Sequence, residues 1–347
     1  LLAGVLLLCA FGLFVLYSAT GQSSARTMAQ AVRLGVALVA MITLAQIPPV
    51  VYRRWAWAGY ALGLALLLVV LISGVSGKGA QRWIDIGFRF QPSEIMKIAV
   101  PMAAAAYLYT RSLPPNLMSL AALAAIILPP VLLIARQPDL GTAILIGASG
   151  AIVVLLAGLR LRVIIAIGAI IGAALPLLWQ QLRDYQRQRV LTMLDPQSDP
   201  LGAGYNIIQS KIASGAGGLF GKGWTNGTQG QLEYLPERST DFIFAVIGEE
   251  FGLLGVMTLM LLYLFVVGRG LYIASQAPDS FSRLLAGSLT LTFFVYVLVN
   301  TAMVTGLLPV VGVPLPLISY GGTSMVTLLG AFGILMSIQT HKRLLPR

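Results

Sequence analysis

The chain has 347 residues, of which 57% are hydrophobic and only 10% are charged. A soluble domain carries roughly 25% charged residues, so this composition indicates an integral membrane protein. The net charge of +11 does not indicate a nucleic-acid partner, because most basic residues stand in short loops beside apolar runs. One cysteine, Cys9, excludes a disulfide within these residues. The only histidine, His341, lies in a basic tail, so acid–base chemistry must come from carboxylates.

Apolar runs of about 20 residues recur along the chain, which is the length that a helix needs to cross a membrane. We predict an all-α polytopic membrane protein with about ten transmembrane helices, in a single domain over residues 1–347. Two connections exceed a simple turn, at about 74–92 and 183–241, and the second is a large loop between the seventh and eighth helices. The ten spans are predicted at about 1–20, 29–48, 54–73, 93–110, 117–135, 139–158, 162–182, 242–267, 282–308 and 321–340.

The charges of the loops predict the orientation in the membrane. One side of the predicted bundle carries a single acid, Asp279, and the basic residues Arg53, Arg54, Arg111, Arg160, Arg162, Arg269, Arg283, Lys342, Arg343 and Arg347. The positive-inside rule places that side in the cytoplasm. Both termini are then cytoplasmic and both long loops are extracytoplasmic. The positive-inside rule counts basic residues in short loops, and Arg26, Lys78, Arg82, Arg89 and Arg136, which lie on the other side outside the large loop, oppose this asymmetry.

Three predicted helices begin on the extracytoplasmic side with a proline shortly before an acid, at Gln91–Glu94, Gln137–Asp139 and Pro236–Asp241. Proline suits the first turn because its missing N–H would be unsatisfied there, and acids suit the positive end of the helix dipole. These preferences are enough to explain any single proline–acid sequence. Three such sequences on one side of the bundle also favour a polar site there, because helix N-termini attract anions such as phosphate.

Lys97 follows Glu94 by three residues and therefore lies on the same helix face. A charged residue at this depth in a membrane helix is costly and is treated as functional by default. Two interpretations remain open. Lys97 has a structural role, in an internal ion pair with Glu94 or by snorkelling to the membrane surface, or it faces the pyrophosphate of a lipid carrier.

Asp241 is the candidate general base, because it stands where the large polar loop meets a membrane helix. Deeper in that helix, Glu249 and Glu250 are expected to form structural hydrogen bonds. The segment Pro309–Ser324 is too rich in proline and glycine for a helix, so we expect it to dip into the bundle and line a polar site.

The polar loop itself is patterned. Asp184–Leu194 and Tyr205–Ser214 have amphipathic spacing and are expected to lie along the membrane surface. The run Gly215–Trp224 fits no phosphate-binding loop, so tight turns are favoured over phosphate contact.

Several of these segments, taken in order along the chain, resemble the SEDS family of bacterial cell-wall polymerases. They are Gln91–Glu94 with Lys97, Gln137–Thr142, Leu235–Phe244 and Pro309–Ser324. Residues 227–231 and 309–316 resemble the elongation-type, RodA-like branch more than the division-type, FtsW-like branch. Members of the elongation branch often have His before the Thr–Asp pair, where this chain has Ser239.

The resemblance implies a peptidoglycan glycosyltransferase that polymerises lipid II at the outer face of the cytoplasmic membrane. It also implies a class B penicillin-binding protein as partner, beside lipid II, the growing glycan strand and membrane lipid. We predict an inverting glycosyl transfer with Asp241 as base and with Glu94, Lys97 and Asp139 in supporting roles. Glu237, Arg238 and Ser319 complete the candidate site. A divalent cation, Mg²⁺ or Mn²⁺, would suit three carboxylates and a pyrophosphate, but the sequence shows no metal site.

The main alternative is a lipid II flippase, which would share the polar cavity. A flippase needs access from both sides and often has related halves. Here the acids concentrate at the outer face and no internal repeat is evident, which favours the polymerase. A scaffold for the transpeptidase would leave the outer carboxylates unexplained.

Overall fold

The computed structural model describes residues 1–77, 80–85, 87, 89–182, 184–199, 202–232 and 234–341. Lys78, Lys342, Arg343 and Arg347, which entered the orientation argument, lie outside these residues, as do positions 183, 200, 201 and 233 of the predicted loop. The longer helices are α1 (Leu2–Ala19), α2 (Ser24–Gln46), α3 (Pro49–Ser73), α4 (Ser93–Tyr109), α5 (Leu117–Arg136), α6 (Leu140–Leu156), α7 (Leu161–Gln181), α11 (Ile243–Ser275), α12 (Ser280–Val304) and α13 (Thr323–Thr340).

These helices correspond to the ten predicted spans, and the all-α polytopic prediction is confirmed. Within the described residues, seven are long and apolar enough to cross a membrane: α1, α2, α3, α5, α11, α12 and α13. α4 and α6 have 17 residues each, and α7 is apolar over 161–174. Helix starts follow local chemistry, since the carboxylate of Asp279 accepts a hydrogen bond from the Ser282 amide at 3.0 Å and begins α12.

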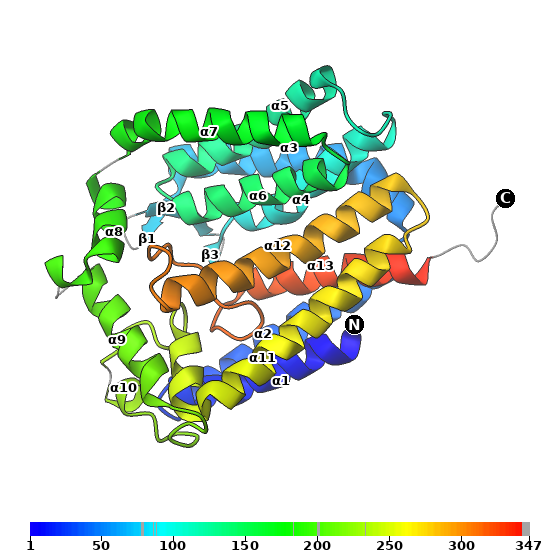
Figure 1. Ribbon diagram of the computed structural model, residues 1–347. Helices are drawn as coiled ribbons and strands as arrows, with labels where there is room; N and C mark the ends of the chain where they lie inside the picture. Colours follow the sequence, from blue (N-terminus) through cyan, green and yellow to red (C-terminus); the bar gives the residue numbers. More distant parts are fainter. Residues whose placement is uncertain are drawn as a thin grey trace.

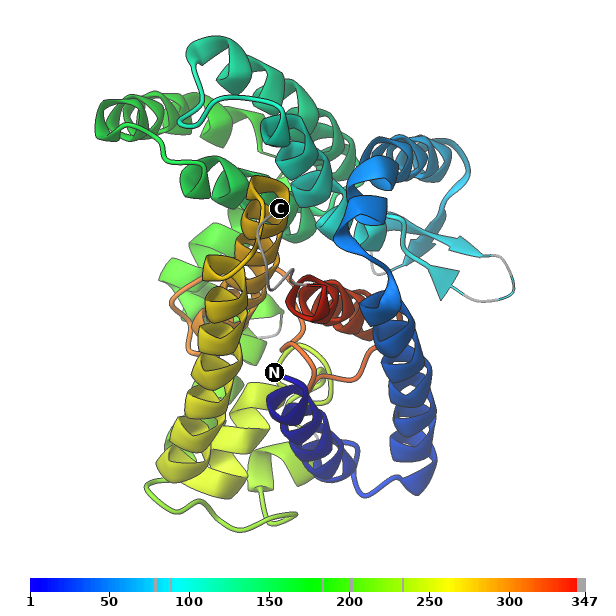
Figure 2. The same ribbon diagram turned by 90° about the vertical axis from the view of Figure 1, so that its right-hand side faces the viewer.

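The helices form a bundle in which α13 lies near the middle. It packs along α2 and also contacts α4, α11 and α12 (Figure 2). α12 in turn contacts α11, α6 and α4, so it joins the two sides of the bundle. One contiguous apolar core runs from Val5 in α1 to Ile338 in α13. α12 is therefore the element that can place groups from different parts of the chain relative to one another.

One end of the bundle carries the additional structure (Figure 1). A small antiparallel sheet occupies the predicted 74–92 connection, with β1 (Val75–Gly77), β2 (Ala80–Asp85) and β3 (Arg89–Phe90). The large loop contains α8 (Asp184–Leu194), a 3₁₀ turn (Pro196–Ser198), α9 (Ala203–Ala216) and α10 (Thr228–Gln231). α8 and α9 match the two predicted amphipathic segments, and they run across the end of the bundle in Figure 1.

α11 is interrupted at Gly252, whose φ of 63° and ψ of −162° are not helical. The glycine-rich run before α10 fills the interruption. The amides of Leu253 and Leu254 donate to the carbonyl oxygens of Gly218 and Leu219 at 2.9 and 3.1 Å. A Cβ at position 252 would lie 2.4 Å from the Gly221 nitrogen, so only glycine fits. The glycine run therefore completes the hydrogen bonds of a broken helix, which agrees with the expected turn chemistry.

Candidate functional site

The segment between α12 and α13 reaches into the bundle, as predicted. Leu315 and Ile318 are each 1% exposed, and the Tyr263 hydroxyl of α11 donates to the Pro316 carbonyl at 2.6 Å. The segment also holds the residues just before α11. Ser319 Oγ donates to the Thr240 carbonyl at 2.5 Å and accepts from the Leu315 amide at 2.8 Å. Two motifs almost eighty positions apart therefore form one unit.

Asp241 belongs to this unit. Its main-chain carbonyl accepts a hydrogen bond from Asn300 Nδ2 of α12 at 2.8 Å, and the same amide donates to the Val313 carbonyl at 2.7 Å. A Cβ built on Gly312 would lie 3.5 Å from Asp241 Oδ2, so the carboxylate faces the backbone of the inserted segment. Gly312 has a φ of 75°, a left-handed conformation that suits glycine. The Asp241 side chain itself is half-buried.

Glu237 and Arg238 lie in the turn that leads to Asp241. Thr240 Oγ1 donates to Glu237 Oε2 at 2.7 Å, and the Phe242 amide donates to the Glu237 carbonyl at 3.2 Å. Glu237 therefore closes the turn. Arg238 reaches the α1–α2 connection, since a Cβ on Gly21 would lie 3.4 Å from its Nη2.

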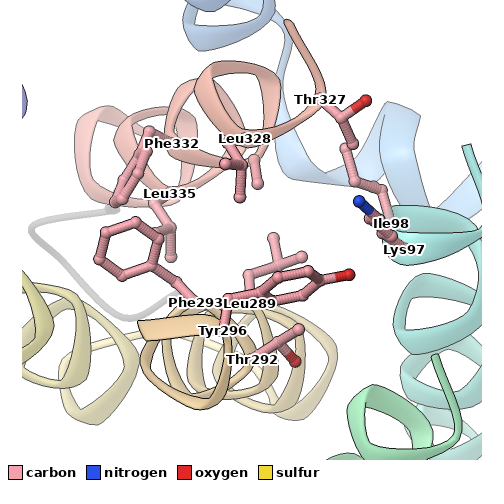
Figure 3. Close-up of a pocket in the computed structure, with 11 residues that line it drawn as sticks. Lys97, Ile98, Leu289, Thr292, Phe293, Tyr296, Thr327, Leu328, Phe332 and Leu335 are labelled. Atoms are coloured by element: carbon pink, nitrogen blue, oxygen red, sulfur yellow. The ribbon is translucent and has the colours of Figure 1, made fainter. Parts of the chain in front are cut away.

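Lys97 and Glu94 form an ion pair, with 2.7 Å between Lys97 Nζ and Glu94 Oε1. This is one of the two interpretations that the sequence left open, and contact with a pyrophosphate stays a hypothesis. The Lys97 ammonium also lies 4.9 Å from the ring centre of Tyr296 on α12. Figure 3 shows Lys97 and Tyr296 lining a cavity of about 30 Å³, otherwise lined largely by apolar side chains.

Asp139 caps α6 and joins it to the small sheet. Its Oδ1 accepts from the Thr142 amide at 3.3 Å. Its Oδ2 accepts from Gln91 Nε2 at 3.3 Å and lies 3.4 Å from Arg82 Nη1. Asp139 is only 4% exposed. The first two proline–acid sequences, which were expected on the same side of the bundle, are therefore adjacent in space.

A cavity of about 780 Å³ opens between α2, the small sheet, α4 and the start of α13. Its walls are mostly apolar, and Arg33, Arg89 and Glu94 provide the charges. The Arg33 guanidinium lies 4.7 Å from the ring centre of Tyr320, whose amide donates to the Ser239 carbonyl at 2.8 Å. This large cavity therefore extends from the Glu94 region to the segment that holds Asp241.

The described residues contain no group of three His, Cys, Asp or Glu side chains that could hold a metal ion. Glu94 and Asp139 are engaged by Lys97 and Arg82, so these carboxylates do not form a vacant cation cage. The described residues therefore do not fit a resident Mg²⁺ or Mn²⁺.

The two deeper acids are structural, as expected. Glu249 is fully buried and accepts from Lys222 Nζ at 2.7 Å, from Thr228 Oγ1 at 3.0 Å and from the amide of Gln229 at 3.1 Å. Glu250 accepts a hydrogen bond from Ser18 of α1. Together they hold the loop that completes the interruption in α11.

Sequence reasoning missed Asn300, Tyr296 and Arg33. Asn300 is completely buried in the membrane helix α12, and an amide side chain at such a position is itself a signal of function. What the sequence could not supply was the partner of each residue.

The chain is similar to known proteins over nearly its whole length. The sequence model of the FtsW/RodA/SpoVE family, described as cell cycle proteins, matches residues 1–344. The peptidoglycan glycosyltransferase MrdB of Escherichia coli K12 is 51% identical over 345 residues, which cover 99% of this chain and 93% of MrdB. A chain of a solved peptidoglycan synthase complex, which coordinates polymerization and crosslinking, has a TM-score of 0.86 and 32% identity, covering 98% and 96% of the two chains. The crystal structure of the rod shape determining protein RodA of Thermus thermophilus has a TM-score of 0.75 and 28% identity, covering 99% and 96%.

Proposed function

We propose that this chain, which belongs to the FtsW/RodA/SpoVE (SEDS) family, is a peptidoglycan glycosyltransferase that polymerises lipid II for cell elongation. The 51% identity to a peptidoglycan glycosyltransferase over nearly the whole chain supports this activity. The observation that carries the proposal is the placement of Asp241. It is a half-buried carboxylate on a backbone that Asn300 and Ser319 hold in place, at the end of the membrane bundle that we propose to be extracytoplasmic.

The reaction is an inverting glycosyl transfer. The 4-hydroxyl oxygen of a GlcNAc on lipid II attacks the anomeric carbon of the lipid-linked glycan. A C–O bond forms there while the bond from that carbon to the pyrophosphate oxygen breaks. Asp241 takes the hydroxyl proton as general base, and the pyrophosphate leaves with the electron pair.

Lys97 and the N-termini of α4 and α6 stabilise the negative charge that develops on the leaving pyrophosphate. Lys97 is held by Glu94, which itself lines the large cavity, and the neighbouring start of α6 is fixed by Asp139. The apolar walls of the large cavity suit a lipid-linked substrate, and Arg33 and Arg89 suit its anionic part. Glu237, Arg238 and Ser319 support the turn that presents Asp241.

The reaction takes place at the outer face of the bacterial cytoplasmic membrane, with both termini in the cytoplasm. The basic residues of the short loops support this orientation. The start of α3, the α6–α7 connection and the start of α12, which contain Arg53, Arg160 and Arg283, lie at the bundle end opposite the small sheet and α8–α10 (Figure 1). Residues 1–347 act as one membrane domain with the 183–241 loop inside it, which agrees with the continuous core.

A class B penicillin-binding protein is the proposed partner, which would crosslink the strands that this chain makes. The structural similarity to a chain of a peptidoglycan synthase complex that couples polymerization to crosslinking supports this partnership.

The test uses the purified protein in detergent with labelled lipid II and no other glycosyltransferase. Glycan length is then resolved on a gel. The proposal predicts a ladder of polymer. Unchanged lipid II would contradict it, and lipid II that crosses the bilayer of proteoliposomes without polymer would support the flippase alternative instead.

A further inference from the structure

Three polar side chains recur at every fourth residue along α12: Thr292, Tyr296 and Asn300. This spacing places them on one face of the helix. They are 7%, 4% and 0% exposed. Each has a buried polar atom: Thr292 Oγ1 and Asn300 Oδ1 make no hydrogen bond of standard geometry with the described residues, and the Tyr296 side chain lies beside Lys97. Buried polar groups of this kind are costly in an apolar helix, so packing alone does not account for the stripe.

Asn300 lies at the end of the stripe that faces the candidate base. Its Nδ2 donates to the carbonyl oxygens of Asp241 and Val313 at 2.8 and 2.7 Å. Both partners are acceptors only, so the amide must direct its NH₂ group toward them. Asn300 therefore ties the backbone of Asp241 to α12 and to the inserted segment at once.

Tyr296 lies one turn earlier and faces Lys97. The ammonium lies 4.9 Å from the ring centre, within the range of a cation–π contact. Figure 3 shows the Tyr296 side chain extending across the small cavity toward Lys97, with Thr292 beside it. Glu94 holds Lys97 from its own helix, so Tyr296 supplies the contact from α12.

We propose that this face of α12 sets the spacing between the two charged groups of the site, with Asn300 as the positioning residue of Asp241 and Tyr296 as that of Lys97. Tyr296 and Asn300 are separated by about 6 Å along a rigid helix. A shift of either charged group would therefore be resisted by the same element. The inference rests on the proposed glycosyl transfer, in which Asp241 takes the proton of the attacking hydroxyl and Lys97 stabilises the leaving pyrophosphate.

Asn300 is tested with Asn300→Asp, which keeps the size and shape of the side chain but removes the donating NH₂. The expected result is a fall in kcat of about 10- to 100-fold, because a displacement of about 1 Å is enough for such a loss. The Kd for labelled lipid II is expected to change by less than about threefold, since Asn300 supports the base and not the leaving group.

The matched control is Thr290→Val, because Thr290 is also buried in α12 and its hydroxyl donates to the Ala286 carbonyl of its own helix. It is expected to keep both kcat and Kd. If Asn300→Asp does not elute as a folded protein, Asn300→Ala is measured in its place, with the same expectation. Wild-type kcat in a folded Asn300 variant would overturn the role of Asn300.

Tyr296 is tested by binding, which does not depend on turnover. Tyr296→Leu is expected to weaken the binding of labelled lipid II by about 3- to 10-fold, since the aromatic contact with Lys97 is lost. Tyr296→Phe keeps the ring and is expected to bind as the wild type does. In a Lys97→Met background, Tyr296→Leu is expected to cause no further loss, because it acts through Lys97.

If Tyr296→Leu weakens lipid II binding equally in the wild-type and the Lys97→Met backgrounds, the proposed role of Tyr296 is overturned. The two failures can be told apart. Absence of polymer from the wild type contradicts the proposed function. A wild type that polymerises, beside variants that behave like Thr290→Val, contradicts only the positioning role of α12.

Discussion

Ser319→Ala should loosen the turn before Asp241, because Ser319 joins that turn to the segment inserted between α12 and α13. The substitution removes the hydrogen bond to the Thr240 carbonyl and leaves the buried Leu315 amide without its acceptor. A lost hydrogen bond costs about 0.5–1.5 kcal/mol and an unsatisfied buried group about 1–3 kcal/mol. Stability should therefore fall by roughly 2–4 kcal/mol, and polymerisation should fall at least tenfold because the Asp241 turn loosens.

The assay combines the thermal midpoint in detergent with the rate of lipid II polymerisation at 25 °C. Ser337→Ala is the matched control. It removes a buried serine hydrogen bond to the Ile47 carbonyl, at the α2–α3 connection far from the site. It should lower stability by about 1 kcal/mol and leave the rate unchanged. A folded Ser319→Ala protein that polymerises lipid II as fast as the wild type would refute the role of Ser319 in holding the turn before Asp241.

Three other outcomes follow from the structure. If Lys97 holds the pyrophosphate, Lys97→Met abolishes polymerisation and the double change with Glu94→Gln does not restore it, whereas restored activity would reduce Lys97 to a structural ion pair. Gly252→Ala should destabilise the protein by roughly 2–5 kcal/mol, because a glycine-only conformation and a close contact with the loop are both violated; an unchanged thermal midpoint would contradict this. A cysteine at Ser198 should react with an impermeant maleimide in intact spheroplasts and one at Arg162 only after lysis, and the reverse pattern would overturn the orientation.

The helices could be predicted because each membrane span is a continuous apolar run in the sequence. Leu117–Arg136 was expected at 117–135, and the correspondence holds for the other spans within a few residues at most ends. α11 is longer than expected at its C-terminal end and runs to Ser275. The interruption at Gly252 was not predicted, because the loop that completes the helix there comes from an earlier part of the chain. The small sheet at 75–90 was not predicted, because its strands are short and depend on their pairing.

The local parts of the site could be read from spacing, and the long-range parts could not. The Glu94–Lys97 pair follows from an i, i+3 separation on one helix. The link from Asn300 to Asp241 joins residues 59 positions apart, and the link from Arg82 to Asp139 crosses from a sheet to a helix start. Such partners depend on how the elements pack. The charged residues could therefore be predicted from the sequence, but the residues that hold them in place could not.

The most direct test of the account is the polymerisation of labelled lipid II by purified Asp241→Asn beside the wild type. Asparagine keeps the shape of the side chain. The hydrogen bond that Asn300 Nδ2 donates to the main-chain carbonyl of residue 241 does not depend on the side chain at 241, so it should persist. The account predicts a folded protein whose polymerisation falls about 10²- to 10⁴-fold, the usual loss when a general base is removed. Glycan synthesis near the wild-type rate by Asp241→Asn would contradict the assignment of Asp241 as the base.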